Sequence, residues 1–352
     1  MKELFLLDPA VTFLNHGSFG ACPRPVFEVY QRWQRELELE PVDFIARRLP
    51  GLLAEARAAL GEYVGADAGD LTFVPNATTG VNMAAAALAL TAEDEVLATD
   101  LEYAACDFTW ERTPARYVRA PLDELFEHVT ERTRVLFVSH ITSETGLLLP
   151  VAQLVARGKE LGLTVVVDGA HAPAHAPLDL RGLGADFYAG NCHKWLCAPK
   201  GAGFLWVAPG WQERVSGAIV SWGQDTFLER TELQGTRDSA AYLSVPAAID
   251  FVREHDDVER SVALCRDARR ELCDLTGLPP IAPEEMVLRM ASFRVPDAER
   301  IARALWEEHR VEIPWMRNDL LRLSCAMYTD REDVERLLDA LAKELRTSRS
   351  PA

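Results

Sequence analysis

Short apolar runs alternate with helix-like segments through the middle of the chain. Segments such as VNMAAAALAL (81–90) and PVAQLVARGKELG (150–162) separate several of the runs. Alternation of this kind predicts an α/β fold, in which a mostly parallel β-sheet is flanked by helices. The apolar runs that we interpret as strands lie at 71–74, 95–98, 134–138, 163–167, 186–189 and 203–207.

The pattern changes on either side of this alternation. Helices are expected at 25–37 and 52–63, and from about Ser244 longer helices surround one strand pair, near 286–294 and 320–324. A length of 352 residues also exceeds one average domain. We therefore expect a large domain followed by a smaller C-terminal α+β domain. The expected division is an N-terminal segment 1–20 packed near the site, a large domain 21–243, a small domain 244–346 and a disordered tail 347–352.

Charge and cysteine usage exclude several classes of protein. The formal net charge of −17 argues against binding to nucleic acid or to an anionic membrane, which needs basic patches. No apolar run approaches the roughly 20 residues that span a bilayer, and the first residues lack the apolar core of a signal peptide. Seven scattered cysteines without a CxxC pair are typical of reduced thiols, so we expect a cytoplasmic protein.

Polar residues follow three of the expected strands, where ligands of a parallel sheet gather. After 71–74, the stretch PNATTGVN opens a helix with Asn76, Ala77 and Thr78. Backbone N–H groups and a hydroxyl at a helix start suit a phosphate, although a simple helix cap explains the same residues.

The next strand end carries the sequence DGAHAPAH. Asp168 there could hold the cationic nitrogen of a heterocycle, or it could cap the following turn. Asp168, His171 and His175 also resemble metal ligands, but Pro173 disfavours a regular helix and no glutamate completes a zinc-protease pattern. We therefore expect no metal.

The third strand end carries Asn191, His193 and Lys194. A solvated turn would explain a lysine there. A lysine within reach of an aspartate is also what an aldehyde cofactor needs, since the amine forms a Schiff base and the carboxylate keeps a pyridine nitrogen protonated. The three motifs in this order favour the cofactor site.

Together these motifs resemble a known enzyme family. The stretches LNHGSFGACPRPV, PNATTGVN, DGAHAP, NCHKWLCAPKGAGFL and QGTRD are similar to those of fold-type I pyridoxal 5'-phosphate enzymes. They look most like the isopenicillin N epimerase-like branch of the class V aminotransferase group, which is related to cysteine desulfurases and carbon–sulfur lyases. The resemblance runs from Phe13 to about Leu338. It implies a seven-stranded type of sheet, pyridoxal 5'-phosphate as cofactor, and a homodimer with shared active sites.

The resemblance also implies roles for individual residues at the cofactor. Lys194 would carry the Schiff base and act as the base at Cα, and Asp168 would pair with the pyridine nitrogen. His171 and Thr142 would hydrogen-bond the phenolic oxygen. The phosphate would be held by Ala77, Thr78, Asn191 and His193.

Further implied roles concern the substrate and the partner subunit. Tyr103 would stack on the cofactor ring, and Arg322 would grip the α-carboxylate, with His16 and Ser18 also on the substrate side. Thr236 would reach the phosphate bound in the other subunit, hence the expected homodimer.

Several reactions stay open at this point. We expect either epimerisation (or racemisation) or β-elimination of a carbon–sulfur bond. Transamination is the alternative reaction. Outside enzymes, the alternative is a scaffold protein that binds the cofactor but has lost catalytic activity. Desulfurase chemistry is disfavoured because residues 307–321, which precede the arginine at 322, hold no cysteine. Epimerisation needs a proton donor opposite Lys194, for which Tyr103 and His16 are candidates. Arg47 and Arg48 either meet a second substrate carboxylate or form a solvated helix face.

Overall fold

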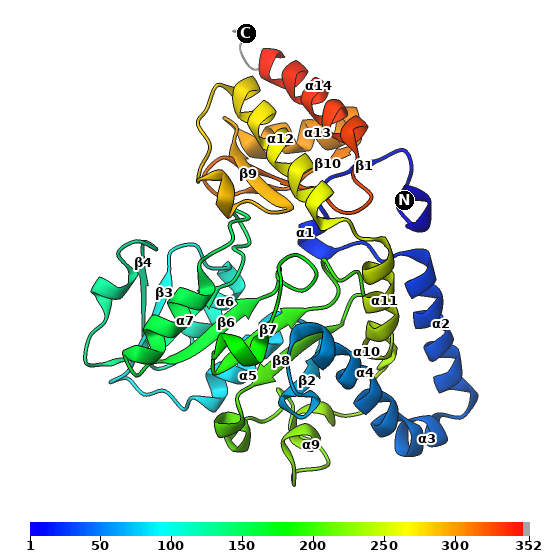
Figure 1. Cartoon of the computed structure of the whole chain (residues 1–352), viewed down its shortest axis with the longest axis vertical. Helices are drawn as coiled ribbons and strands as arrows, with labels where there is room; N and C mark the ends of the chain where they lie inside the picture. The colour runs from blue at the N-terminus through cyan, green and yellow to red at the C-terminus, as the bar shows by residue number, and fades with distance from the viewer. Residues whose placement is uncertain (348–352) are drawn as a thin grey trace.

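The structure, a computed structural model, describes residues 1–347 and contains one large sheet below a smaller α+β body (Figure 1). The large sheet has seven strands in the order β2-β8-β7-β6-β5-β3-β4. All neighbours from β7 to β4 are parallel, and β8 runs antiparallel to both β7 and β2. The predicted α/β fold with a mostly parallel sheet is thus confirmed. The strands are β2 (Leu71–Val74), β3 (Glu95–Thr99), β4 (Arg116–Ala120), β5 (Thr133–Ser139), β6 (Thr164–Gly169), β7 (Phe187–Asn191) and β8 (Gly203–Val207).

Burial explains which strands the sequence revealed. Residues of β2, β3, β7 and β8 are buried along their whole length, as expected for strands covered on both faces. The edge strand β4 was not predicted. Its sequence RYVRA is partly exposed except at Ala120, so it lacks the apolar run by which the other strands were recognised.

Helices cover both faces of this sheet. Gly80 of α5 lies so close to the sheet that an added Cβ would sit 2.9 Å from the Cβ of Ala189 in β7. This close contact fixes the start of α5 beside the end of β7. The helices before residue 256 are α1 (His16–Phe19), α2 (Arg24–Leu39), α3 (Pro41–Asp43), a π-helical turn (Phe44–Arg48), α4 (Leu49–Val64), α5 (Ala77–Ala87), α6 (Ala104–Glu111), α7 (Val151–Glu160), α8 (Leu180–Leu183), α9 (Phe227–Glu232), α10 (Ala240–Leu243) and α11 (Val245–His255).

The smaller body combines an antiparallel sheet with three helices. Strand β12 (Leu320–Ser324) lies between β11 (Trp315–Met316) and β9 (Met290–Arg294), and α12 (Val258–Thr276), α13 (Ala298–His309) and α14 (Arg331–Thr347) complete it. The strand expected from 286 begins only at Met290. The boundary at residue 244 stays a prediction, since α11 packs against α2 and α4 of the preceding part.

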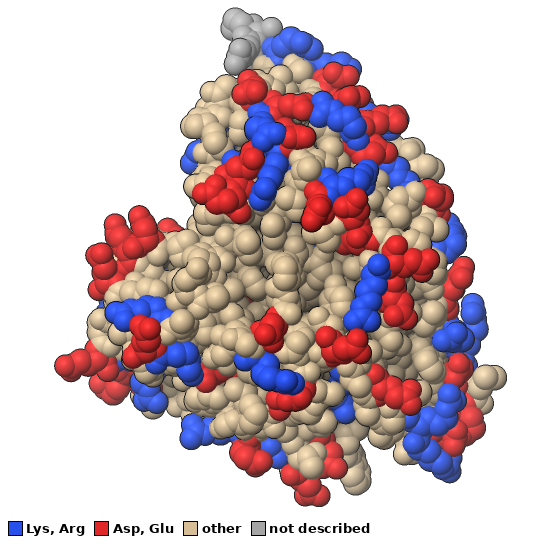
Figure 2. All heavy atoms as spheres, viewed as in Figure 1, with Lys and Arg blue, Asp and Glu red and all other residues tan. Residues whose placement is uncertain are grey.

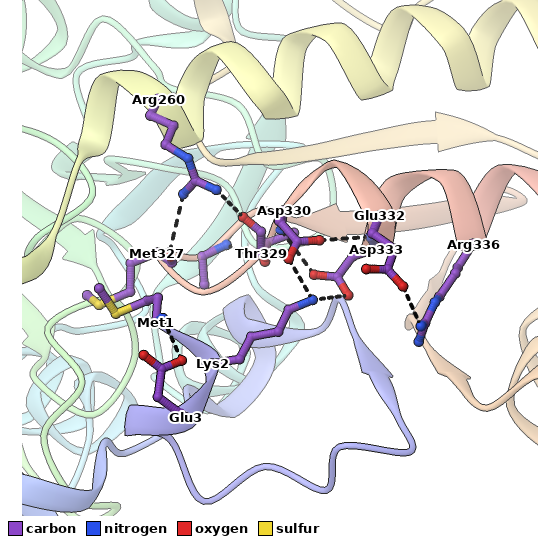
Figure 3. A network of polar contacts seen from close by, with 11 residues as sticks. Met1, Lys2, Glu3, Arg260, Met327, Thr329, Asp330, Glu332, Asp333 and Arg336 are labelled. Carbon is purple, nitrogen blue, oxygen red and sulfur yellow. Dashed lines mark hydrogen bonds and ion pairs between the residues drawn. The ribbon is translucent and has the colours of Figure 1, made fainter.

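The N-terminal segment is attached to the smaller body. Its strand β1 (Thr12–Phe13) pairs in parallel with β10 (Val311–Glu312). Figure 3 shows how Lys2 ends between Asp330 and Asp333 at the start of α14, at 2.9 and 2.8 Å. Helix α1 follows β1 in the sequence and precedes α2. It lies at the junction of the two bodies (Figure 1).

The surface and the C-terminus complete the description. Acidic and basic side chains are interspersed over the face seen in Figure 2, and the junction of the two bodies there is largely uncharged. Across residues 1–347, no helix combines the length and apolar character that crossing a membrane requires. Of the predicted tail, Thr347 is the last residue of α14, and 348–352 lie outside the described residues.

Candidate active site

A cavity of about 380 Å³ lies where the large sheet meets the smaller body. It is lined by residues that follow β2, β3, β5, β6 and β7, together with α1 and β12. The structure therefore brings together all but three of the predicted site residues. Those that line the cavity are Ser18, Ala77, Thr78, Tyr103, Asp168, His171, Asn191, His193, Lys194 and Arg322.

The hydrogen bonds of His171 define the state of Lys194. The indole N–H of Trp195, which can only donate, lies 3.4 Å from His171 Nδ1, so the proton of the neutral imidazole is on Nε2. That atom lies 3.1 Å from Lys194 Nζ and can donate to it only if the amine is neutral. Burial, assisted by the charge of Arg322, lowers the pKa of Lys194 to about 8. The site thus favours an uncharged, nucleophilic amine.

His16 does not line the cavity, and its place beside the substrate stays a prediction. Its Nδ1 accepts from the backbone N–H of Ala21 at 3.3 Å and lies 3.0 Å from the hydroxyl of Tyr328. Its Nε2 lies 3.0 Å from the carbonyl oxygen of Lys194. With both nitrogens engaged and the ring buried, His16 positions the backbone of Lys194.

A glycine makes this contact possible. Gly20 has φ +69°, and an added Cβ would lie 2.1 Å from the carbonyl oxygen of His193. Only glycine fits such a left-handed position against another backbone. The N-terminal segment can therefore pack directly on the loop that carries Lys194.

Asp168 is a buried carboxylate with weak partners. Its Oδ1 accepts from the N–H of Ala170 at 2.9 Å, and its Oδ2 faces the thiol of Cys106 at 3.5 Å. Burial raises its pKa, which the nearby charge of Lys194 opposes. A buried carboxylate held by one amide and a weak thiol donor lacks a strong counterpart. The protonated nitrogen of a pyridine ring would provide it, so Asp168 fits pyridoxal phosphate.

The start of α5 offers donors for a phosphate. Asn76 accepts from the N–H of Thr79 at 2.9 Å, and Asn191 accepts from that of Ala77 at 2.8 Å. Asn191 thus supports the helix start, and the hydroxyl of Thr78 lines the cavity next to it. Nδ1 of His193 donates to the carbonyl oxygen of Ala202 at 2.8 Å, so Nε2 of the neutral ring is an acceptor and could donate to a phosphate only after the ring gains a proton. A helix start with a hydroxyl fits the phosphate of the cofactor.

Arg322 reaches the cavity from β12 of the smaller body. Its side chain is buried; one nitrogen donates to the hydroxyl of Ser18 at 2.7 Å and another to the carbonyl of Ser143. Its Nε is buried and has no hydrogen-bond partner among residues 1–347. Burial lowers its pKa to about 10, so the guanidinium stays charged near neutral pH. A buried cation with a free donor is what a carboxylate ligand requires.

Tyr103 precedes α6 and is 41% exposed beside the cavity. The sequence analysis missed the residue that holds it there, Glu102. The buried Glu102 carboxylate accepts from the hydroxyl of Thr99 and from both the N–H and the hydroxyl of Ser139 at the end of β5. Burial raises the pKa of Glu102 to about 8. Its position directly before an aromatic residue at a strand end was the only sequence signal.

Thr142 does not line the cavity, and its contact with the cofactor stays a prediction. Its buried hydroxyl lies 2.6 Å from that of Thr145 and accepts from the N–H of Leu147 at 2.9 Å, so it shapes a turn. Thr236 lines a different cavity, with Arg57 and Glu232. Its reach into a second subunit stays a prediction.

Two alternatives from the sequence can be placed as well. His175 accepts from the N–H of Arg289 and does not line the cavity that holds Asp168 and His171. The exposed Arg47 and Arg48 pair locally with Asp43 and Glu36, as in a solvated helix face.

Comparisons with known proteins agree with this geometry. The sequence pattern of the family described as aminotransferase class V matches residues 45–268. Isopenicillin N epimerase of Streptomyces clavuligerus is 39% identical over 96% of this chain and 95% of its own length. L-cysteine desulfhydrase of Arabidopsis thaliana is 28% identical over 95% and 87%.

A solved structure is similar over the whole chain. A lysine-to-alanine variant of C-DES, with glycine covalently linked to its pyridoxal phosphate cofactor, has a TM-score of 0.86 and 25% sequence identity. The match covers 97% of this chain and 99% of that one. This chain therefore belongs to the class V aminotransferase family and is a pyridoxal-phosphate-dependent enzyme of the epimerase or carbon–sulfur lyase type.

Proposed function

We propose that the enzyme removes the Cα proton of an amino acid on one face and delivers another proton to the opposite face, as an epimerase or racemase does. The observation that carries this is that two groups able to transfer protons enter one cavity from strands on either side of the strand of Asp168. Lys194 follows β7, and Tyr103 follows β3, while the strand of Asp168 lies between them in the order β7-β6-β5-β3. An inversion needs one such group on each face of the reacting carbon.

The protein residues have distinct tasks in this reaction. The cofactor, when bound, supplies the electron sink that makes a Cα proton acidic. Arg322 binds the α-carboxylate, and Ser18 keeps its guanidinium in place. His171 donates to the amine of Lys194, which takes the proton in its neutral form. Tyr103 carries the hydroxyl that gives a proton from the other side.

Elimination across a carbon–sulfur bond is the second candidate. It begins with removal of the same proton, and the similarity to C-DES, described as a cystine C–S lyase, favours it. Transfer of sulfur to the protein is not supported, because none of the cavity-lining residues is a cysteine. Burial raises the pKa of Cys192, and a hydrogen bond with Cys265 together with burial raises that of Cys325, which keeps both thiols unreactive.

Two further features belong to this proposal. A homodimer is supported by an exposed apolar loop, in which Val220 and Trp222 are 77% and 87% exposed, and by Thr236, which the family resemblance directs to a partner. A cytoplasmic location is supported by the seven cysteines, all free in the structure.

The test is proton NMR of amino acids incubated with the cofactor-loaded enzyme in deuterated water. Epimerisation predicts Cα exchange together with the enantiomer, whereas elimination predicts pyruvate and a released thiol or sulfide. Tyr103→Phe should keep exchange and lose most inversion, and Lys194→Ala should lose both. Inversion at the wild-type rate in Tyr103→Phe, or no exchange with any amino acid, would contradict the proposal.

A further inference from the structure

Apart from histidines, the cavity is lined by four side chains of acidic or basic type: Glu144, Asp168, Lys194 and Arg322. The proposed function uses three of them. Asp168 and Lys194 serve the cofactor, and Arg322 serves the α-carboxylate. Glu144 is a carboxylate without a task in that reaction, and it lines the same cavity.

The position of Glu144 relative to Arg322 is fixed by its own backbone. It lies in the loop between β5 and α7, and the carbonyl of the preceding residue, Ser143, accepts from Arg322. The carbonyl of Glu144 itself accepts from the hydroxyl of Ser292 in β9 at 2.6 Å. The loop is therefore held against the smaller body. Glu144 directly follows the residue whose carbonyl contacts Arg322, the group that binds the α-carboxylate.

Arg317 covers Glu144 from the solvent side. Its Nε and a terminal nitrogen both contact the same oxygen, Oε1 of Glu144, at 2.7 Å. Arg317 is followed by Asn318 and Asp319, which adopt left-handed φ values of 62° and 55° in the turn between β11 and β12. Arg317 is half exposed and does not line the cavity, so the carboxylate rather than the guanidinium faces an incoming side chain.

The charges distinguish between substrates. With an α-carboxylate on Arg322, the pairs Arg322–substrate and Arg317–Glu144 are each neutral. A second carboxylate at the end of the side chain would add an unpaired negative charge beside Glu144, and like charges in contact are strongly unfavourable. An amide of the same shape could donate to Glu144 instead.

We propose that Glu144 is a specificity-determining residue, which together with Arg317 rejects amino acids whose side chain ends in a carboxylate and accepts those that end in an amide or another neutral donor. This rests on the proposed function only in placing the α-carboxylate at Arg322. Arg317 moderates the rejection, because it neutralises part of the charge of Glu144.

Two variants should act in opposite directions. Glu144→Gln removes the negative charge and should bring the preference for amide over acid close to one. Arg317→Gln leaves Glu144 without its cation and should increase the preference for amide over acid. A purely structural ion pair between the two bodies would instead weaken binding of both ligands alike in both variants.

The experiment uses the cofactor-loaded enzyme and two unreactive ligands of matched shape, glutarate and glutaramate. Their dissociation constants follow from changes in cofactor absorbance on titration. We expect wild type to prefer glutaramate by about tenfold or more, as expected for like charges in proximity. The matched control is Glu93→Gln, at an exposed glutamate in the turn before β3, which should behave as wild type.

Cα exchange with L-glutamine and L-glutamate gives the parallel kinetic comparison. If no amino acid exchanges but the binding ratios shift as described, the proposed reaction fails and the role of Glu144 stands. If exchange occurs and the ratio is unchanged in Glu144→Gln, the role of Glu144 fails. The role of Glu144 would also be overturned if both variants changed the preference for amide over acid in the same direction, or if neither ligand showed saturable binding.

Discussion

Lys194 should titrate near pH 8 in the cofactor-free enzyme. Burial is the main cause of the lowered pKa, and the positive charge of Arg322 adds to it. The neutral amine is the reactive form, so reactivity should rise with pH through about 8 and fall below it. An ordinary lysine titrates near 10.5.

The lowered pKa of Lys194 greatly increases the neutral fraction of its amine at physiological pH. At about pH 7.5 a group with a pKa of 8 is roughly one-quarter neutral, whereas one with a pKa of 10.5 is about one-thousandth neutral. The environment of Lys194 therefore increases the amount of free amine roughly 200-fold. His171, which donates to the amine, is itself kept neutral because burial lowers its pKa well below the usual range.

The assay is imine formation between the cofactor-free enzyme and pyridoxal, trapped with borohydride and quantified by peptide mass spectrometry over a range of pH. Labelling in Lys194→Ala gives the background from other lysines. Arg322→Gln should move the midpoint to higher pH, because the second cause of the shift is removed. A wild-type midpoint above about pH 10 would refute the reasoning.

Three other outcomes are expected. Asp168→Asn should retain cofactor but turn over about 10²-fold more slowly, measured as Cα exchange, since it removes the charge facing the pyridine nitrogen. Arg289→Met should lower the free energy of unfolding, measured in urea, by about 3–5 kcal/mol. The reason is that the buried Asp256 carboxylate, which lies 2.7 Å from Arg289, loses its cation. The double variant Arg289→Met/Asp256→Asn should recover part of the lost stability. With L-cysteine, alkylation should trap no persulfide on Cys192 or Cys325, and any sulfur should leave in solution together with pyruvate instead of alanine.

Much of the fold and cofactor site could be predicted because the relevant signals are local. Buried parallel strands leave apolar runs, and the residues that follow them meet at one edge of the sheet. For that reason Asp168 and Lys194 could be assigned to one site from their order in the chain. The edge strand β4 escaped because half-exposed residues leave no such run.

Contacts between distant segments were decided only by the tertiary structure. Glu144 and Arg317 are 173 residues apart, and they meet because two loops of different bodies pack together. His16 and Thr142 have residue types that suit a ligand, but neighbours in space already satisfy their polar atoms. A sequence shows which polar side chains a protein carries. It does not show which of them are already hydrogen-bonded to other parts of the folded chain. The chemistry of the cofactor therefore follows from local motifs, whereas the choice of substrate depends on how the two bodies are packed.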